Sequence, residues 1–250
     1  MTVQKTISFS KYIKWFWGII AGGFLFICLL FLLASWGVFG ALPSFEELEN
    51  PKRDLATEVI SADGKTLGKY YIKANRTPIK YKDLPDNLIK ALVATEDERF
   101  YEHSGIDFRG LARAISRLGT EGGASTITQQ LAKNLFNKGG ASNKLVRLTQ
   151  KLKEYVVAVK LERQYTKQEI ITMYLNTQGF VFHATGIRSA SRIYFGKEPR
   201  ELDLQESAIL VAMLKNPRQF NPHREISKKK SLSRRNVVFF QMAKNEIITQ

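Results

Sequence analysis

The longest apolar run lies near the start of the chain. Residues 15–45 contain no charged side chain, and residues 15–39 are almost continuously apolar. A run of that length can span the roughly 30 Å hydrocarbon core of a membrane as a tilted helix. It is too long for the apolar part of a signal peptide, and no clear small-residue cleavage site precedes Leu42. Lysines precede the run and the next basic residue after it is Lys52, so the positive-inside rule predicts a cytoplasmic N-terminus.

A second apolar pattern leads to a carboxylate. Glu96 follows an apolar stripe whose spacing places it on one face of a helix beginning at Pro85, formed by Leu88, Ile89, Leu92 and Val93. A glutamate at the end of such a stripe is costly unless it is paired or functional. Glu96 therefore suits a general acid or base. The spacing fits equally well a glutamate that caps the helix or forms an ordinary ion pair.

A third pattern combines glycines with a polar helix face. Gly122 and Gly123 precede Ser125, a favourable N-cap for a helix over residues 126–136. On this helix one face is apolar, and the other carries Thr126, Gln130 and Lys133, with Gln129 beside them. Free N–H groups at a helix start, together with a lysine, can form an anion site. An amphipathic helix with a solvated polar face is the competing interpretation.

The remaining elements follow from shorter signals. Alternating residues around Asp63-Gly64 predict a β-hairpin over residues 57–61 and 66–72, and every other element is expected to be helical. Asp107 is a suitable cap for a helix that ends near Leu118. Residues 143–164 form a long amphipathic helix with an apolar stripe at Leu145, Leu148, Leu152, Val156 and Val159. Two capping boxes, Thr166 to Glu169 and Asp203 to Glu206, begin the later helices.

The net charge of the chain limits the chemical classes of binding partner that are expected. Lys and Arg number 38 against 23 Asp and Glu, giving a net charge of +15. Such an excess implies an acidic partner: nucleic acid, anionic lipid or a phosphate-bearing substrate. No zinc-finger spacing or RNA-binding signature is present, and a membrane helix argues against nucleic acid. The single cysteine, Cys28, excludes an intrachain disulfide. The basic run over residues 228–235 is expected to face solvent or lipid headgroups.

Two long segments then indicate a family. ATEDERFYEHSGID and GGASTITQQLAKN resemble the first two signature motifs of the peptidoglycan glycosyltransferases, the glycan-polymerising domains of class A penicillin-binding proteins and monofunctional transglycosylases. The resemblance covers about residues 84–242. It implies a mainly α, lysozyme-like domain with a membrane-proximal jaw at residues 119–145. The N-terminal transmembrane helix and the small β-hairpin element predicted above complete the expected fold. The expected organisation is a cytoplasmic tail at 1–14, the membrane helix at 15–39, a stalk with the hairpin at 40–82 and the glycosyltransferase domain at 83–245. Residues 246–250 are expected to start a truncated linker to a missing transpeptidase domain.

The resemblance also implies an activity and its residues. Lipid II would be polymerised into β-1,4-linked glycan with inversion at the muramic-acid anomeric carbon and release of polyprenyl diphosphate. Glu96 would be the base, and Glu154 the second catalytic carboxylate, orienting basic residues or the diphosphate. The residues expected to bind substrate are Phe100, His103, Ser125, Thr126, Gln129, Gln130, Lys133, Asn134, Arg147 and Lys151. His103 is expected to make a structural hydrogen bond that positions the first motif, and Asp97 is expected to be structural.

The metal requirement stays open, with Mg or Mn as a candidate at the diphosphate. Expected partners are lipid II, the growing glycan strand, the membrane and other cell-wall synthesis proteins. The expected location is the bacterial inner membrane, with a single pass and the catalytic domain on the periplasmic side.

Two departures from the family pattern keep alternatives open. Gln150 stands where the third motif has an arginine, and Val181 lies in a turn that is usually Tyr-Phe-Gly-like. A lytic glycan-cleaving enzyme on the same fold and a non-catalytic cell-wall scaffold are the rival hypotheses. The lysines argue against a hydrolase, which has no diphosphate to hold. No Lys-Thr-Gly motif of a transpeptidase is present.

Overall fold

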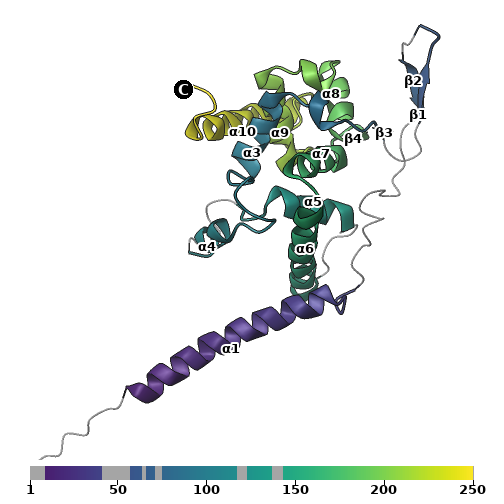
Figure 1. Cartoon of the computed structure of the whole chain (residues 1–250). Helices are drawn as coiled ribbons and strands as arrows, with labels where there is room; N and C mark the ends of the chain where they lie inside the picture. Colours follow the sequence, from purple (N-terminus) through teal and green to yellow (C-terminus); the bar gives the residue numbers. More distant parts are fainter. Residues whose placement is uncertain are drawn as a thin grey trace, which may run out of the picture. The chain divides into compact units, whose positions relative to one another are not determined.

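The chain is mainly helical, as expected, with an apolar N-terminal helix and one β-hairpin (Figure 1). The computed structural model describes residues 9–40, 57–63, 66–70, 75–116, 123–136 and 143–249. Two compact units can be distinguished: Met1–Leu42 with Ala141–Val156, and Pro43–Gly140 with Val157–Gln250. Residues 119–122 and 137–142 of the expected jaw lie outside the described residues.

The first unit contains α1 (Ser10–Ser35) and the first part of α6 (Lys144–Gln164). By length and composition α1 could cross a membrane, with a mean hydropathy of 2.5. Ala34 packs with Leu152 and Val156 of α6, so the predicted apolar stripe is buried there. Two other stripe members are exposed instead, Leu145 at 74% and Leu148 at 54%.

The second unit is built around α3 (Asp86–Glu96), α9 (Leu204–Lys215) and α10 (Glu225–Lys244), which pack against one another. Leu88 and Leu92 on the predicted face of α3 are fully buried, as is Val238 of α10. Full burial of each such side chain contributes about 1.5–3 kcal/mol. This packing fixes the C-terminal end of α3, where Glu96 is the last helical residue.

Further helices complete this unit. Helix α5 (Ile127–Phe136) packs on α7 (Lys167–Thr177), and α8 (Ile187–Phe195) packs on α9. Helix α4 (Phe108–Ser116) follows Asp107, whose carboxylate accepts the Gly110 N–H at 2.9 Å. Both predicted capping boxes are confirmed, before α7 and before α9. Two short 3-10 helices, η1 (Tyr81–Asp83) and η2 (Pro199–Glu201), join the longer elements.

The strands include a pair that the sequence did not predict. The hairpin is confirmed, because β1 (Thr57–Ile60) pairs antiparallel with β2 (Thr66–Tyr70). The expectation that all else is helical is wrong, since β3 (Asn75–Arg76) pairs in parallel with β4 (Ala184–Thr185). Just after β3, the Asn176 side chain accepts the Ile79 N–H at 2.9 Å and donates to its carbonyl at 3.0 Å. This tertiary contact holds the segment beside β4.

Candidate functional site

A cavity of about 790 Å³ lies where α3 ends, beside the start of α5 and the C-terminal half of α10. All of its lining residues belong to the second unit. Carboxylates and cations face each other across it. The acidic side chains are Glu96, Asp97, Glu98 and Asp107, and the basic ones are Arg113, Lys215, Arg234 and Lys244.

Glu96 is held in this cavity by a chain of hydrogen bonds. Its side chain is 15% exposed, and Gln130 Nε2 donates to Glu96 Oε2 at 2.9 Å. The Tyr174 hydroxyl donates to Gln130 Oε1 at 2.9 Å, which directs the Gln130 amino group at Glu96. Burial, and then the charge of Glu96, raises the pKa of Tyr174 well above 10, so this hydroxyl stays a donor. The sequence predicted Glu96 and Gln130, but not Tyr174.

Arg234 faces the same carboxylate and corrects the expectation for the basic run. Its Nη2 lies 4.0 Å from Glu96 Oε1, and its side chain is only 17% exposed. The Nε of Arg234 is buried and has no hydrogen-bond partner within the described part of the chain. Arg234 turns inward because it shares a helical face with the buried Ser231 and Val238. That periodicity was the available signal for this residue.

Asp97 links the end of α3 to the start of α5. Its carboxylate accepts the Ile127 N–H at 2.9 Å, and His103 Nε2 lies 2.9 and 3.1 Å from its two oxygens. The structural hydrogen bond predicted for His103 is therefore confirmed. The predicted open anion site at this helix start needs correction, because an internal carboxylate already occupies the Ile127 N–H.

Gly105 explains the close approach of the first motif to α6 and α5. Its φ is +91°, and a Cβ here would lie 2.9 Å from the Ala158 backbone, so only glycine fits without strain. Its carbonyl accepts from Thr126 Oγ1 at 2.8 Å and Gln129 Nε2 at 3.1 Å. Thr126, not Ser125, is the cap, since it accepts the Gln129 N–H at 3.1 Å. Thr126 and Gln129 are 2% and 1% exposed and support the loop through these contacts, while their expected contact with substrate stays a prediction.

Phe100 is another expected substrate contact that lies in the interior. It is fully buried, with the Lys167 ammonium 4.3 Å from its ring centroid. Lys167 Nζ also donates to the His103 carbonyl at 2.6 Å and lies 2.8 Å from a Glu162 oxygen. Phe100 therefore holds the first motif in place, and its expected contact with substrate stays a prediction.

The remaining predicted residues fall into two groups. Ser125 lines the cavity, while Lys133 is exposed and Asn134 half-buried on α5. In the other unit, Lys151 Nζ lies 3.0 Å from Glu154 Oε2 and 5.2 Å from the Tyr155 ring centroid. Arg147 is exposed and Glu154 is buried there. Among the residues that the structure describes, no three His, Cys, Asp or Glu side chains cluster to hold a metal ion.

Glu98 adds a fixed negative charge to the cavity. Arg113 Nη1 and Lys244 Nζ donate to it at 3.0 and 3.1 Å. These hydrogen bonds, that of Arg113 first, lower the pKa of Glu98 below its ordinary value of 4.5 despite partial burial. The side chain therefore stays ionised at neutral pH and ties the end of α3 to α4 and α10.

Known proteins are similar to this chain over the segment that contains both motifs. A family model described as transglycosylase matches residues 63–243. Penicillin-binding protein 1A of Haemophilus influenzae is 39% identical over 93% of this chain and 26% of the relative. Penicillin-binding protein 1A of Escherichia coli is 36% identical over 96% of this chain and 28% of the relative. That of Aquifex aeolicus is 38% identical over 90% of this chain and 30% of the relative.

A crystal structure of the Haemophilus influenzae penicillin-binding protein 1A aligns with 79% of this chain and 19% of its own, at 25% identity and a TM-score of 0.42. The chain thus spans between a quarter and a third of the length of these curated relatives. The family match covers both signature motifs and the residues of the cavity up to Gln241. The chain belongs to the transglycosylase family.

Proposed function

We propose that this chain is a membrane-anchored peptidoglycan glycosyltransferase that polymerises lipid II into β-1,4-linked glycan strands. The donor is the growing strand, whose muramic-acid sugar is α-linked to a polyprenyl diphosphate. The acceptor is the 4-hydroxyl of the N-acetylglucosamine of an incoming lipid II. The family match and the penicillin-binding protein 1A relatives support this reaction class.

In the proposed reaction, Glu96 is the general base. Its carboxylate takes the proton of the acceptor hydroxyl as that oxygen bonds to the anomeric carbon. The bond from that carbon to the diphosphate oxygen breaks with its electron pair, so polyprenyl diphosphate leaves from the opposite face. An inverting displacement needs this arrangement of base and leaving group.

The observation that carries the proposal is the geometry around Glu96. One carboxylate oxygen is occupied by Gln130 at 2.9 Å, which orients the group. The other lies 4.0 Å from Arg234, too far for a hydrogen bond, and borders the cavity. A carboxylate with one anchored oxygen and one oxygen open to a substrate-sized cavity suits a general base better than a simple ion pair.

Stabilisation of the leaving group is proposed for the cationic side chains. Lys133, with Asn134, and separately Arg147 and Lys151 are proposed to stabilise the diphosphate as its charge develops. Glu154 is proposed to orient Lys151, with which it forms an ion pair at 3.0 Å. A divalent cation at the diphosphate is a further candidate for this stabilisation.

The location and partners belong to the same proposal. Helix α1 would anchor the chain in the inner membrane, with the N-terminus in the cytoplasm and the catalytic part on the periplasmic side. The length and apolar composition of α1 support the anchor. The membrane, the lipid-linked strand and other cell-wall synthesis proteins are the proposed partners, with no nucleic acid.

The test separates synthesis from cleavage. The purified chain is given either lipid II or finished glycan strands, and products are resolved by length. Polymer from lipid II with no shortening of finished strands supports the proposal. Shortening of finished strands without polymerisation would instead identify a lytic enzyme, and neither product would favour a scaffold.

A further inference from the structure

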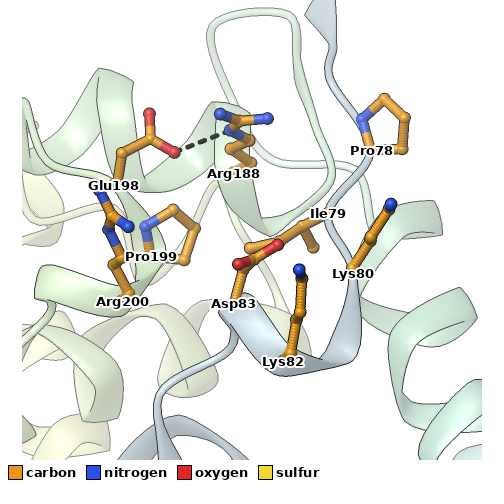
Figure 2. Close-up of a pocket in the computed structure, with 9 residues that line it drawn as sticks. All are labelled: Pro78, Ile79, Lys80, Lys82, Asp83, Arg188, Glu198, Pro199 and Arg200. Carbon is orange, nitrogen blue, oxygen red and sulfur yellow. Dashed lines mark hydrogen bonds and ion pairs between the residues drawn. The ribbon is translucent and has the colours of Figure 1, made fainter.

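A second cavity, of about 350 Å³, lies in the same unit as Glu96 but shares no lining residue with the cavity there. One wall is the segment from Pro78 to Asp83, which leads from β3 into η1. The other wall consists of Arg188 on α8 together with the residues around η2 (Figure 2). The catalytic proposal makes no use of this cavity.

Both walls are fixed by contacts within the protein. The backbone of Ile79 is bonded through both its N–H and its carbonyl to the Asn176 side chain on α7, at 2.9 and 3.0 Å. On the opposite wall, Pro199 begins η2, and the Glu198 N–H donates to Glu201 Oε2 at 2.9 Å. The cavity is therefore preformed, which lowers the entropic cost of binding a ligand.

The charge of the lining is biased toward cations. The basic side chains are Lys80, Lys82, Arg188 and Arg200, against Asp83 and Glu198. The Glu198 carboxylate is already engaged, because Arg188 Nε donates to it at 2.8 Å and Arg192 Nε donates to its other oxygen. Lys80, Lys82 and Arg200 have no ion-pair partner among the described residues. Of the two carboxylates in this lining, only Asp83 is left to balance the charge of these three cations.

We propose that this cavity binds a phosphate-bearing ligand. Figure 2 shows the two lysines on the wall of η1 and Arg200 on the wall of η2, so cations approach the space from two sides. A phosphate offers three oxygens in different directions and suits this arrangement better than a planar carboxylate does. The volume falls within the range of small-molecule sites. The ligand is either a soluble phosphate compound or the headgroup of a lipid.

The experiment uses the full chain in maltoside detergent micelles, which contain no phosphate, with inorganic pyrophosphate as the probe. The reporter is the ¹³C-labelled δ1 methyl group of Ile79, which lines the cavity. Its resonance is identified by its loss in Ile79→Val. Pyrophosphate that binds in the Glu96 cavity should leave the Ile79 signal unchanged, because Ile79 does not line that cavity. A saturable shift of the Ile79 signal is expected.

Two double variants test whether the cavity itself binds the probe. Lys82→Gln with Arg200→Gln should weaken binding at least about tenfold, because two charge-assisted contacts are lost. Both side chains are exposed, so the fold should persist. The matched control, Lys228→Gln with Lys229→Gln, removes the same charge from the exposed side of α10 and should stay within about twofold of wild type.

The outcomes separate the sources of the ligand. If phosphatidylglycerol added to the micelles shifts the Ile79 signal before any pyrophosphate is added, a lipid headgroup occupies the cavity. If only pyrophosphate does so, the ligand is soluble. The absence of a saturable shift with either probe would overturn the proposal, as would equal weakening by the cavity variant and the control.

Discussion

At the scale of single residues, the orientation of one amide bears directly on the role of base that we propose for Glu96. Gln130 can present either its amino group or its carbonyl to a neighbour, and only the amino group stabilises a carboxylate. The Tyr174 hydroxyl selects that orientation by donating to Gln130 Oε1 at 2.9 Å. Tyr174 is thus a positioning residue that acts through Gln130.

Tyr174→Phe should reduce turnover more than it reduces stability. Without the hydroxyl, Gln130 can rotate its amide and turn its carbonyl toward Glu96, which leaves the base poorly held. We expect lipid II polymerisation to fall about tenfold, while loss of one buried hydrogen bond costs about 1 kcal/mol. Polymerisation kinetics and thermal unfolding check the two effects. Unchanged turnover in a folded variant would show that the chain of hydrogen bonds is not needed.

The structure places some of the predicted site residues at the cavity and buries others. Glu96 and Gln130 were found because motif and helical periodicity agree on them. Thr126, Gln129 and Phe100 were expected to touch substrate, yet all three are buried. The sequence could not show this, because their burial depends on contacts between segments far apart in the chain, such as Thr126 with Gly105 at 2.8 Å. Arg234 was missed because it stands in a run of surface charges.

At the scale of elements, the sequence predicted those that depend on neighbouring residues but not those that depend on contacts between distant segments. The capping boxes before α7 and α9, and the hairpin of β1 and β2, were predicted from adjacent residues and are confirmed. The β3–β4 pair has two residues in each strand, too few for any periodicity to show. Next to this pair, the Asn176 side chain bonds both backbone groups of Ile79, a contact that no local pattern encodes.

The ion pair of Lys167 and Glu162 should be worth more than a surface pair. The Glu162 side chain is 4% exposed, and it lies 2.8 Å from Lys167, which also holds the His103 carbonyl. Lys167→Met leaves a buried carboxylate without its cation and should cost about 3–5 kcal/mol. The double variant Glu162→Leu with Lys167→Met should recover part of that loss. Denaturant unfolding of both singles and the double gives the coupling, and additive effects would argue against a buried pair.

The Glu98 contacts predict a pH dependence of stability. Hydrogen bonds from Arg113 and then Lys244 hold the pKa of Glu98 below its ordinary value of 4.5. A carboxyl group with a lowered folded-state pKa stabilises the fold above its unfolded pKa, and this contribution is lost as the pH falls through the folded value. Glu98→Gln should therefore lower the thermal midpoint at pH 7, and the difference from wild type should shrink as the pH falls below 4.5.

The control for this prediction is Glu225→Gln, an exposed residue at the start of α10. It should change the thermal midpoint little at either pH. A Glu98→Gln effect that is the same at pH 7 and at low pH would mean that the stabilisation does not come from the ionised carboxylate.

At the scale of the whole molecule, the net charge of +15 predicted an acidic partner, and the structure shows where basic side chains gather. They line the cavity beside Glu96, and they line the cavity between η1 and η2. The first is assigned to the reaction and the second to a separate phosphate-bearing ligand. Composition alone could state the sign of the partner's charge. It could not show that acidic and basic side chains balance in the Glu96 cavity, while basic ones outnumber acidic ones in the second cavity.

The most direct test of the central claim is the rate of lipid II polymerisation by Glu96→Gln in the full chain. The substitution keeps the shape of the side chain and removes the proton acceptor, so turnover should fall by about 10²- to 10⁴-fold. The matched control, Glu102→Gln, lies on the exposed turn that follows α3 and should retain wild-type turnover. Thermal unfolding of both variants shows that the fold persists. Near-normal polymerisation by a folded Glu96→Gln variant would contradict the assignment of Glu96 as the base.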